Sequence, residues 1–316
     1  MTGRRRRRDR AIQIVTLAIT AIALVLLIRH ARSVDWPQVW QALAGYRLHE
    51  VTTAAALAAL SYLLYCSYEL GARHYAGHGL STRRTMLIGF TCYAFSLNIG
   101  ALIGGGGFRL RLYSHSGLRA GAIGRIVAFA VSTNWSGYLV LAGGVLIAQP
   151  IVLPQGAASI AGRVLGLAML VVAAAYLFAC ARWHDRAWHL RGHAFKLPSL
   201  RMALLQLGLS SANWLTIAAL LFVLLQQRID YPTVLGVLLL AAVAAAVTHI
   251  PAGLGALEAI FLAMLGERVA QPELLAALLA YRAIYYLGPL LLAAIAYLAF
   301  ESGAVRRRGP HPDDVG

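Results

Sequence analysis

Two glycine-rich interruptions of apolar sequence carry the residues whose types and spacing suggest chemistry. The first, at residues 98–113 (NIGALIGGGGFRLRLY), places two arginines directly after a run of four glycines. Glycine lets the backbone approach a ligand closely and leaves N–H groups for an anion, and arginine binds phosphate through paired hydrogen bonds. We therefore predict a site for the phosphate of a lipid headgroup at the mouth of this segment, formed by Asn98, Gly105, Gly106, Arg109, Arg111 and Tyr113.

The positive charges after this glycine run also have an ordinary explanation. Lysine and arginine collect in the cytoplasmic loops of membrane proteins. We prefer that explanation for Arg119 and Arg125. We favour the phosphate site for Arg109 and Arg111, because these two adjoin the break in the apolar sequence.

The second interruption, at residues 249–258 (HIPAGLGALE), ends in a carboxylate. Glu258 lies well inside one apolar run and Arg282 lies well inside another. A carboxylate within a membrane needs a cationic partner, so we predict that these two residues pair and act as a gate or counter-ion. A purely structural pair that fastens the two segments together is the alternative. Glu69, which precedes Arg73 by one helical turn, is expected to form a structural pair near the inner face.

A further group of polar and helix-breaking residues is predicted to line the second break or an intramembrane cavity. Each member also has a simpler role: a histidine can cap a helix, amides can hold helices together, and a tyrosine can belong to an aromatic belt. The group consists of His249, Pro251, Gly253, Gly255, Asn134, Asn213 and Tyr285.

Catalytic motifs are missing from the sequence. It contains no Walker loop, no Gly-x-Ser-x-Gly and no set of metal-ligand residues at metal spacing, and its three cysteines fall singly in apolar segments. We therefore expect no cofactor, no bound metal and no enzyme activity. An intramembrane enzyme that modifies lipid through Glu258 or His249 is kept as a third alternative.

Composition identifies the class of protein that holds these residues. Of the 316 residues, 59% are hydrophobic and 13% are charged, and the mean hydropathy is +0.67. Apolar runs of roughly 20 residues have the length that crosses the hydrocarbon of a bilayer. The net charge of +16 comes from basic residues between these runs, which is the positive-inside pattern of membrane proteins and argues against nucleic-acid binding.

The order of apolar and basic segments predicts an all-α polytopic membrane protein. A basic cytoplasmic N-terminus (1–10) precedes a single transmembrane domain (11–302). The domain begins with a retained first crossing (11–28) and an amphipathic segment (33–46), which either lies in the outer interface or forms an ordinary loop helix. A polar cytoplasmic tail (303–316) follows. Further crossings are expected at about 49–72, 122–148, 160–181, 202–225 and 273–300, with broken stretches at about 86–108 and 233–265.

Charge parity decides how the two broken stretches lie. If each crossed the membrane once, the basic loop at 182–201 would face outward, against the positive-inside rule. If both are re-entrant, every basic cluster and both termini are cytoplasmic. We therefore predict six full helices and two broken hairpins, arranged as an inverted repeat of halves at about 49–148 and 202–300.

Four motifs in order resemble those of a known family. They are residues 105–118 (GGGFRLRLYSHSGL), 133–138 (TNWSGY), 249–259 (HIPAGLGALEA) and 279–286 (LAYRAIYY). The sequence is similar to the lysylphosphatidylglycerol synthase transmembrane-region, or flippase-like, family, and within it to the small stand-alone bacterial inner-membrane members. The likeness covers nearly the whole chain apart from the N-terminal arginines and the tail.

The resemblance implies a function in lipid handling. Larger relatives join this membrane module to a soluble aminoacyl transferase that makes lysyl-phosphatidylglycerol, and the module is thought to translocate that lipid. This sequence shows no transferase, so we expect an inner-membrane protein that binds and flips an anionic phospholipid of the phosphatidylglycerol or cardiolipin class without ATP. The alternative is a non-transporting membrane partner that recruits or regulates a phospholipid-synthesis enzyme.

Overall fold

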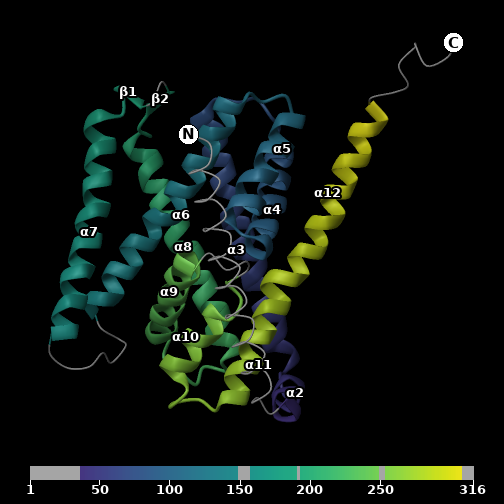
Figure 1. Ribbon diagram of the computed structural model, residues 1–316, viewed down its shortest axis with the longest axis vertical. Coiled ribbons are helices and arrows are strands. Elements are labelled where there is room, and N and C mark those ends of the chain that lie inside the picture. The colour runs from purple at the N-terminus through teal and green to yellow at the C-terminus, as the bar shows by residue number, and fades with distance from the viewer. Residues whose placement is uncertain (1–35, 149–156, 191–192, 249–252, 308–316) are drawn as a thin grey trace, which may run out of the picture.

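The protein is a long bundle of helices (Figure 1). The structure is a computed structural model and describes residues 36–148, 157–190, 193–248 and 253–307. Its elements are α2 (Trp36–Ala44), α3 (Leu48–Ala76), α4 (Thr82–Ile99), the π-helix η1 (Ala101–Gly107), α5 (Phe108–His115), α6 (Ala120–Ala148), α7 (Ala157–Trp183), β1 (Ala187–Leu190), β2 (His193–Lys196), α8 (Leu200–Leu224), α9 (Tyr231–Thr248), α10 (Ala256–Leu265), α11 (Gln271–Tyr281), the π-helix η3 (Arg282–Leu287) and α12 (Gly288–Arg307).

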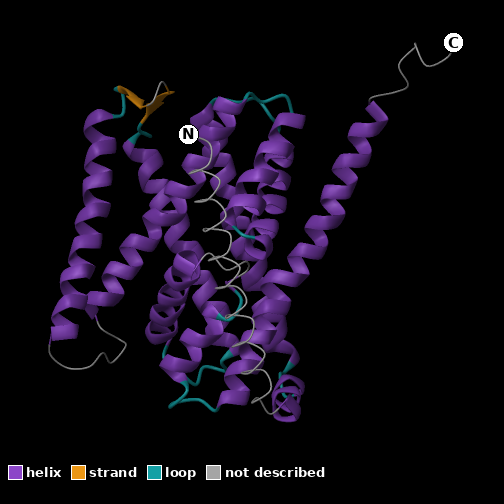
Figure 2. Ribbon diagram, viewed as in Figure 1, coloured by secondary structure: helices purple, strands orange, loops and turns teal. Residues whose placement is uncertain are grey.

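The predicted all-α class holds for the described residues with one addition. A short antiparallel pair of strands, β1 and β2, follows α7 at one end of the bundle (Figure 2). The helix α12 continues to Arg307, so residues 303–307 of the predicted tail belong to a helix. The predicted N-terminus (1–10), the first crossing (11–28) and the end of the tail (308–316) lie outside the described residues.

Six described segments are long and apolar enough to span a membrane: Leu48–Ala76, Ala120–Ala148, Ile160–Trp183, Leu200–Leu224, Tyr231–Thr248 and Gln271–Leu298. Five of them match predicted crossings. The sixth, α9, is the first arm of what the sequence analysis treats as a broken stretch at 233–265. With 18 residues it is about 27 Å long at 1.5 Å per residue, which is nearly the thickness of bilayer hydrocarbon.

The first interruption folds as a helical hairpin. Helix α4 ends at Gly100, whose φ of 104° favours glycine. The glycine run then coils as η1, and α5 returns alongside α4, with the rings of Phe95 and Phe108 stacked at a centroid distance of 4.2 Å. Glycine is required where the two arms meet, because a Cβ on Gly104 would lie 2.3 Å from the Phe95 carbonyl oxygen.

The second interruption separates two helices that pack on each other, α9 and α10. The break contains Gly253 and Gly255, with φ angles of 57° and 82° in the region that favours glycine. His249 and Pro251, two predicted site residues, lie outside the described residues.

The two hairpins open at opposite ends of the bundle (Figure 1). Helix α4 begins and α5 ends at the end that carries β1 and β2, where the Tyr75 hydroxyl of α3 donates to the Lys196 carbonyl. Helix α9 begins and α10 ends at the other end, beside α2. There Val39 of α2 is buried against Leu275 and Ala276 of α11, so α2 is fastened to the bundle through one face and leaves Trp40 exposed.

Packing between the long helices depends on small residues, as is common in membrane bundles. Helix α6 approaches α8 so closely at Gly137 that a Cβ there would lie 2.4 Å from the Ser211 nitrogen. In contrast, α7 and α12 turn large apolar side chains outward, including Ile160, Val164, Leu291 and Ile295. Apolar outer faces of this kind suit contact with lipid rather than water.

The close contact at Gly137 gives a stability test with a matched control on the same helix. We expect Gly137→Ala to force α6 and α8 apart and to cost about 1–3 kcal/mol of stability, as overpacking usually does. Gly144→Ala should leave stability unchanged or raise it slightly, because nothing lies within 4 Å of a Cβ at Gly144. Thermal unfolding of both variants in detergent measures the difference, and equal unfolding temperatures would contradict the packing described here.

Candidate functional site

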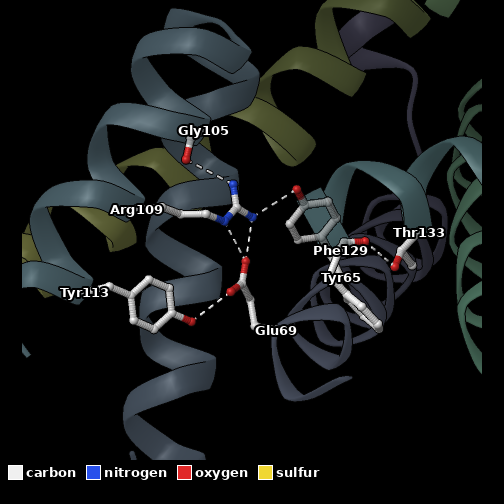
Figure 3. A network of polar contacts seen from close by, with 7 residues as sticks. All are labelled: Tyr65, Glu69, Gly105, Arg109, Tyr113, Phe129 and Thr133. Carbon is white, nitrogen blue, oxygen red and sulfur yellow. Dashed lines mark hydrogen bonds and ion pairs between the residues drawn. The ribbon is translucent and has the colours of Figure 1, made fainter. Parts of the chain in front are cut away.

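A buried ion pair joins α3 to the first hairpin (Figure 3). The Arg109 Nε donates to Glu69 Oε1 at 2.7 Å, and the two residues are 4% and 0% exposed. Arg109 Nη2 also lies 2.6 Å from Glu69 Oε1 and donates to the Tyr65 hydroxyl at 3.2 Å, and Nη1 donates to the Gly105 carbonyl at 3.0 Å. Tyr113 donates to the second carboxylate oxygen of Glu69 at 2.8 Å. Both buried charges are therefore paired and hydrogen-bonded, as burial requires.

The hairpin geometry explains why Arg109 lies deep rather than at the predicted mouth. Helix α5 starts at the inner end of the hairpin and runs outward, so the residues directly after the glycine run are the deepest of that arm. Arg109 is buried there with its charge balanced by Glu69. Arg111 is exposed, and its guanidinium carbon lies 5.9 Å from the centre of the Tyr297 ring on α12. A phosphate role for either residue stays a prediction.

Glu69 has a different partner from the one predicted. Arg73, one turn further along α3, donates instead to the Thr82 hydroxyl at the start of α4. The side chain of Glu69 lies against α4, where a Cβ on Gly89 would come within 2.5 Å of its Cγ. This close approach directs the carboxylate toward Arg109 and Tyr113 on α5.

The glycine run contributes differently from the prediction. It coils into η1, where Gly104 donates its N–H to the Gly100 carbonyl at 2.9 Å. Gly105 offers its carbonyl to a cation, Arg109. The part of the run that contacts the ion pair therefore supplies an acceptor rather than a donor for an anion. Gly106 has open space around it, with no atom nearer than 4.0 Å to a Cβ placed there.

A second ion pair lies at the second break. Arg282 Nε donates to Glu258 Oε1 at 2.5 Å, and Arg282 Nη2 donates to Glu258 Oε2 at 3.1 Å. The backbone of the break completes the pair, because Gly255 donates its N–H to Glu258 at 2.9 Å and Gly253 accepts from Arg282 at 3.3 Å. The side chains are 14% and 21% exposed for Arg282 and Glu258. The structure thus brings together the two residues that the sequence analysis paired.

A cluster of tyrosines, which we call the tyrosine cluster, lies between the two ion pairs. Its members are Tyr62, Tyr65, Tyr93, Tyr281, Tyr285 and Tyr286. Tyr65 touches the first pair and stacks on Tyr93 at 3.6 Å, while Tyr281 stacks on Tyr285 at 5.3 Å. The guanidinium carbon of Arg282 lies 5.3 Å from the centre of the Tyr286 ring, which closes the connection to the second pair.

Hydrogen bonds fix the orientation of the central tyrosines. Ser61 donates its single proton to Asn213 Oδ1 at 2.6 Å. The Tyr285 hydroxyl, 2.7 Å from Ser61, must therefore donate to Ser61, and Tyr93, 2.7 Å from Tyr285, must donate to Tyr285. Two predicted residues, Asn213 and Tyr285, thus belong to one buried chain of hydrogen bonds.

The two other predicted residues, Asn98 and Asn134, take part in contacts between helices, one through its amide and one through its backbone. Asn98 donates to the carbonyl of Ala94 at 2.8 Å and to that of Tyr286 at 3.3 Å, which ties the first hairpin to η3. Asn134 contributes its backbone carbonyl, which accepts from Ser210 at 2.8 Å and from Trp214 at 3.4 Å. The side-chain contact of Asn98 with Tyr286 favours the simpler role, the attachment of one helix to another. The role of the Asn134 amide stays a prediction.

Residues that the sequence analysis did not assign to the site follow a regular spacing. Ser61, Tyr65 and Glu69 recur every four positions along α3 and so share one face. All three enter the buried network through the contacts described above. This spacing could have identified the three residues as part of the site from the sequence, because polar residues on one face of a membrane helix point to the interior of the bundle rather than to lipid.

The first ion pair gives a stability test. We expect Glu69→Gln to cost about 3–5 kcal/mol, because it leaves the Arg109 charge buried and unpaired. The double change Glu69→Gln with Arg109→Gln should cost less than the single change, since no unpaired charge remains. Glu273→Gln is the control: Glu273 forms a half-exposed pair with Arg228, and such pairs contribute about 0–1 kcal/mol. Thermal unfolding checks all three variants, and a double variant as unstable as Glu69→Gln would contradict the expectation.

Comparisons with known proteins identify the family. The model of the lysylphosphatidylglycerol synthase TM region matches residues 13–293. The chain is 42% identical over 299 residues to the "Inner membrane protein YbhN" of Escherichia coli (strain K12), which covers 94% of each protein. It is 30% identical over 307 residues to the "Uncharacterized protein slr0712" of Synechocystis sp., covering 92% of each.

A larger relative matches over part of the chain. The "Phosphatidylglycerol lysyltransferase" of Staphylococcus haemolyticus is 35% identical over 103 residues, which is 31% of this chain and 12% of that protein. The family match spans most of the chain and includes both hairpins and the helices that carry the two ion pairs. This multi-pass membrane protein therefore belongs to the lysylphosphatidylglycerol synthase transmembrane-region family.

Proposed function

We propose that this protein moves an anionic phospholipid between the two leaflets of the inner membrane, without ATP and without modifying the lipid. The observation that carries the proposal is that each of the two helix breaks holds an ion pair. The two hairpins open at opposite ends of the bundle, and the tyrosine cluster lies between the ion pairs. Broken helices with charges at membrane depth are typical of transport sites.

The arrangement of the helices supports an inverted repeat. In the first half, α3 and α6 flank the α4–α5 hairpin; in the second, α8 and the final helices flank the α9–α10 hairpin. The hairpins point in opposite directions, as the two halves of an inverted repeat would. In this interpretation both hairpins are re-entrant, and α9 enters and α10 leaves by the same face.

The distribution of charge supports an orientation. The end of α3 and the starts of α4, α6 and α8 lie toward the end that carries β1 and β2 (Figure 1). These helix ends contain Arg73, Arg83, Arg125 and Arg201. The positive-inside rule assigns this end to the cytoplasm. The mouth of the first hairpin would then face the cytoplasm and that of the second the opposite side, with both chain termini cytoplasmic.

The ion pairs suggest how the protein would select an anionic lipid. Separating a buried carboxylate from its guanidinium costs about 3–5 kcal/mol unless another anion takes its place. A headgroup phosphate can replace Glu258 on Arg282, because the pair is still partly exposed. The name of the Staphylococcus relative includes phosphatidylglycerol, which supports a lipid of the phosphatidylglycerol or cardiolipin class.

The tyrosine cluster would act as the barrier between the two mouths. Its rings stack and its central hydroxyls satisfy one another, so no open path crosses the bundle between Tyr93 and Tyr285 in this conformation. Displacing Arg282 would remove its contact with Tyr286. Displacement of Arg282 at the second hairpin would therefore alter the packing of the tyrosine cluster, which contacts the first ion pair through Tyr65.

A feature of the proposed cytoplasmic face supports a second candidate function, in which the protein recruits or regulates a phospholipid-synthesis enzyme without transporting lipid. The loop between α7 and α8 forms a β-hairpin flanked by Arg182, Arg186 and Arg201. Capture of such an enzyme that survives loss of Arg109 and Glu258 but fails when residues 182–201 are neutralised would favour this candidate.

Lipid flipping in proteoliposomes tests the proposal. Exchange of a fluorescent phosphatidylglycerol analogue, followed by quencher accessibility, should be fast with the wild-type protein and at least about tenfold slower with Glu258→Gln or Arg282→Gln, since a lost charge-assisted interaction of this kind costs about 1.5–3 kcal/mol. The matched controls are Glu273→Gln and Arg228→Gln, which remove the exposed pair at the outer end and should exchange lipid at the wild-type rate.

Two results would contradict the proposal. One is an absence of exchange by folded wild-type protein, with and without a proton gradient, which would favour the recruitment candidate. The other is an unchanged rate in Glu258→Gln, which would leave the second ion pair a structural fastening. Unfolding temperatures measured in parallel separate a lost function from a lost fold.

A further inference from the structure

A depression of about 440 Å³ opens at the cytoplasmic mouth of the first hairpin. Its lining is basic and polar and includes no carboxylate; it consists of Leu70, Arg73, His74, Gly77, His78 and Thr82. The nearest acidic side chain on α3, Glu69, is fully buried, and Arg109 already balances its charge. The depression therefore has a surplus of positive charge, unlike either ion pair.

The local fold explains how these side chains come together. Helix α3 ends at Gly77, whose φ of 69° favours glycine and turns the chain back toward the helix. The His78 N–H then bonds to the Arg73 carbonyl at 3.3 Å. Arg73 Nη1 donates to the Thr82 hydroxyl at 2.9 Å, which holds the guanidinium at the rim and uses one of its five N–H donors.

Among the described residues, the imidazole of His78 has no hydrogen-bond partner. Both of its ring nitrogens are buried, and neither has a partner within the part of the chain that the structure describes. Burial, together with the neighbouring Arg73, holds the pKa of His78 below its usual value. A neutral imidazole still carries one N–H, and a buried donor without an acceptor is costly, so a phosphate oxygen that enters the depression and reaches this ring would supply the missing acceptor.

The shared chemistry of these groups points to one kind of ligand. We infer that this depression binds a phosphate group, held by Arg73, His74 and His78, which belongs either to a lipid headgroup or to a soluble phosphate compound. Guanidinium and imidazole N–H groups are donors suited to phosphate oxygens. The first turn of the 18-residue helix α4, which begins at Thr82, adds its positive dipole end on the same side.

The position of the site gives it a connection to the buried network. The ring of His78 contacts that of Tyr113 edge-on at a centroid distance of 5.6 Å. Tyr113 in turn donates to Glu69, the partner of Arg109. A bound phosphate would therefore lie two contacts from the first ion pair, on the side from which a lipid of the cytoplasmic leaflet would enter.

Binding of inorganic phosphate to the purified full-length protein in a phosphate-free detergent tests the inference, with affinity measured by calorimetry. We expect saturable binding that Arg73→Gln or His78→Gln weakens by about tenfold or more, since a charge-assisted hydrogen bond contributes about that factor. The matched control is Arg83→Gln, which removes the same charge at the same end, but from an exposed side chain outside the depression.

His74→Gln keeps the test decisive if Arg73→Gln disturbs the start of α4, because His74 is exposed and lines the depression without a role in that contact. No saturable phosphate binding by folded wild-type protein would overturn the inference, since water alone would then fill the depression. Equal weakening by Arg83→Gln and Arg73→Gln would also overturn it, because the attraction would then be diffuse.

Two nanodisc compositions identify the source of the phosphate, at a salt concentration that screens surface charge. If a lipid headgroup is the ligand, inorganic phosphate should bind in discs of phosphate-free galactolipid and should be displaced in discs of phosphatidylglycerol. If a soluble phosphate compound is the ligand, the affinity should be the same in both. The binding test requires no lipid transport, so loss of flipping and loss of phosphate binding would be separate results.

Discussion

Every charge buried in a bilayer must be balanced within a few ångströms, and the pairing of Glu69 with Arg109 shows what that requirement imposes on the rest of the chain. The α3 helix must pass close enough to α4 that a glycine, Gly89, faces the glutamate. The first hairpin must turn at a depth that places Arg109 opposite it. The backbone must also turn a carbonyl, that of Gly105, toward the guanidinium. Helix contacts, glycine positions and hairpin depth all follow from one electrostatic constraint.

The second hairpin meets the same constraint with the same means. There too a glutamate and an arginine from different segments pair at a helix break, and glycine backbone atoms complete the hydrogen bonds of both charges. The two solutions differ in accessibility, because the first pair is sealed and the second is partly open. This difference between otherwise similar pairs would suit the proposed transport, in which one side is closed while the other exchanges its partner.

The pattern of apolar runs and breaks predicted the helical class, five of the six described spans and both interruptions, because these depend on composition and helix propensity. The pairing of Glu258 with Arg282 was predictable because each is the isolated charge of its segment. The partner of Glu69 was not, since Arg73 is nearer in sequence and the choice of Arg109 depends on how the hairpin packs against α3. The depth of Arg109 and the stacking of the tyrosine cluster likewise follow from tertiary packing, which spacing along the chain does not encode.

The π-helix η3 gives the final membrane segment a means of rotating α12 about its own axis. It lies between α11 and α12 within one apolar span and carries Arg282, Tyr285 and Tyr286. A π-turn holds one residue more than an α-turn needs, and π-turns occur mostly as single-turn bulges inside α-helices. Absorbing that extra residue into regular α-helix would rotate α12 about its own axis by roughly 100°. Such a rotation would swing Tyr297 away from Arg111. Rotation of the last helix about its axis would therefore couple the interior of the bundle to the mouth of the first hairpin.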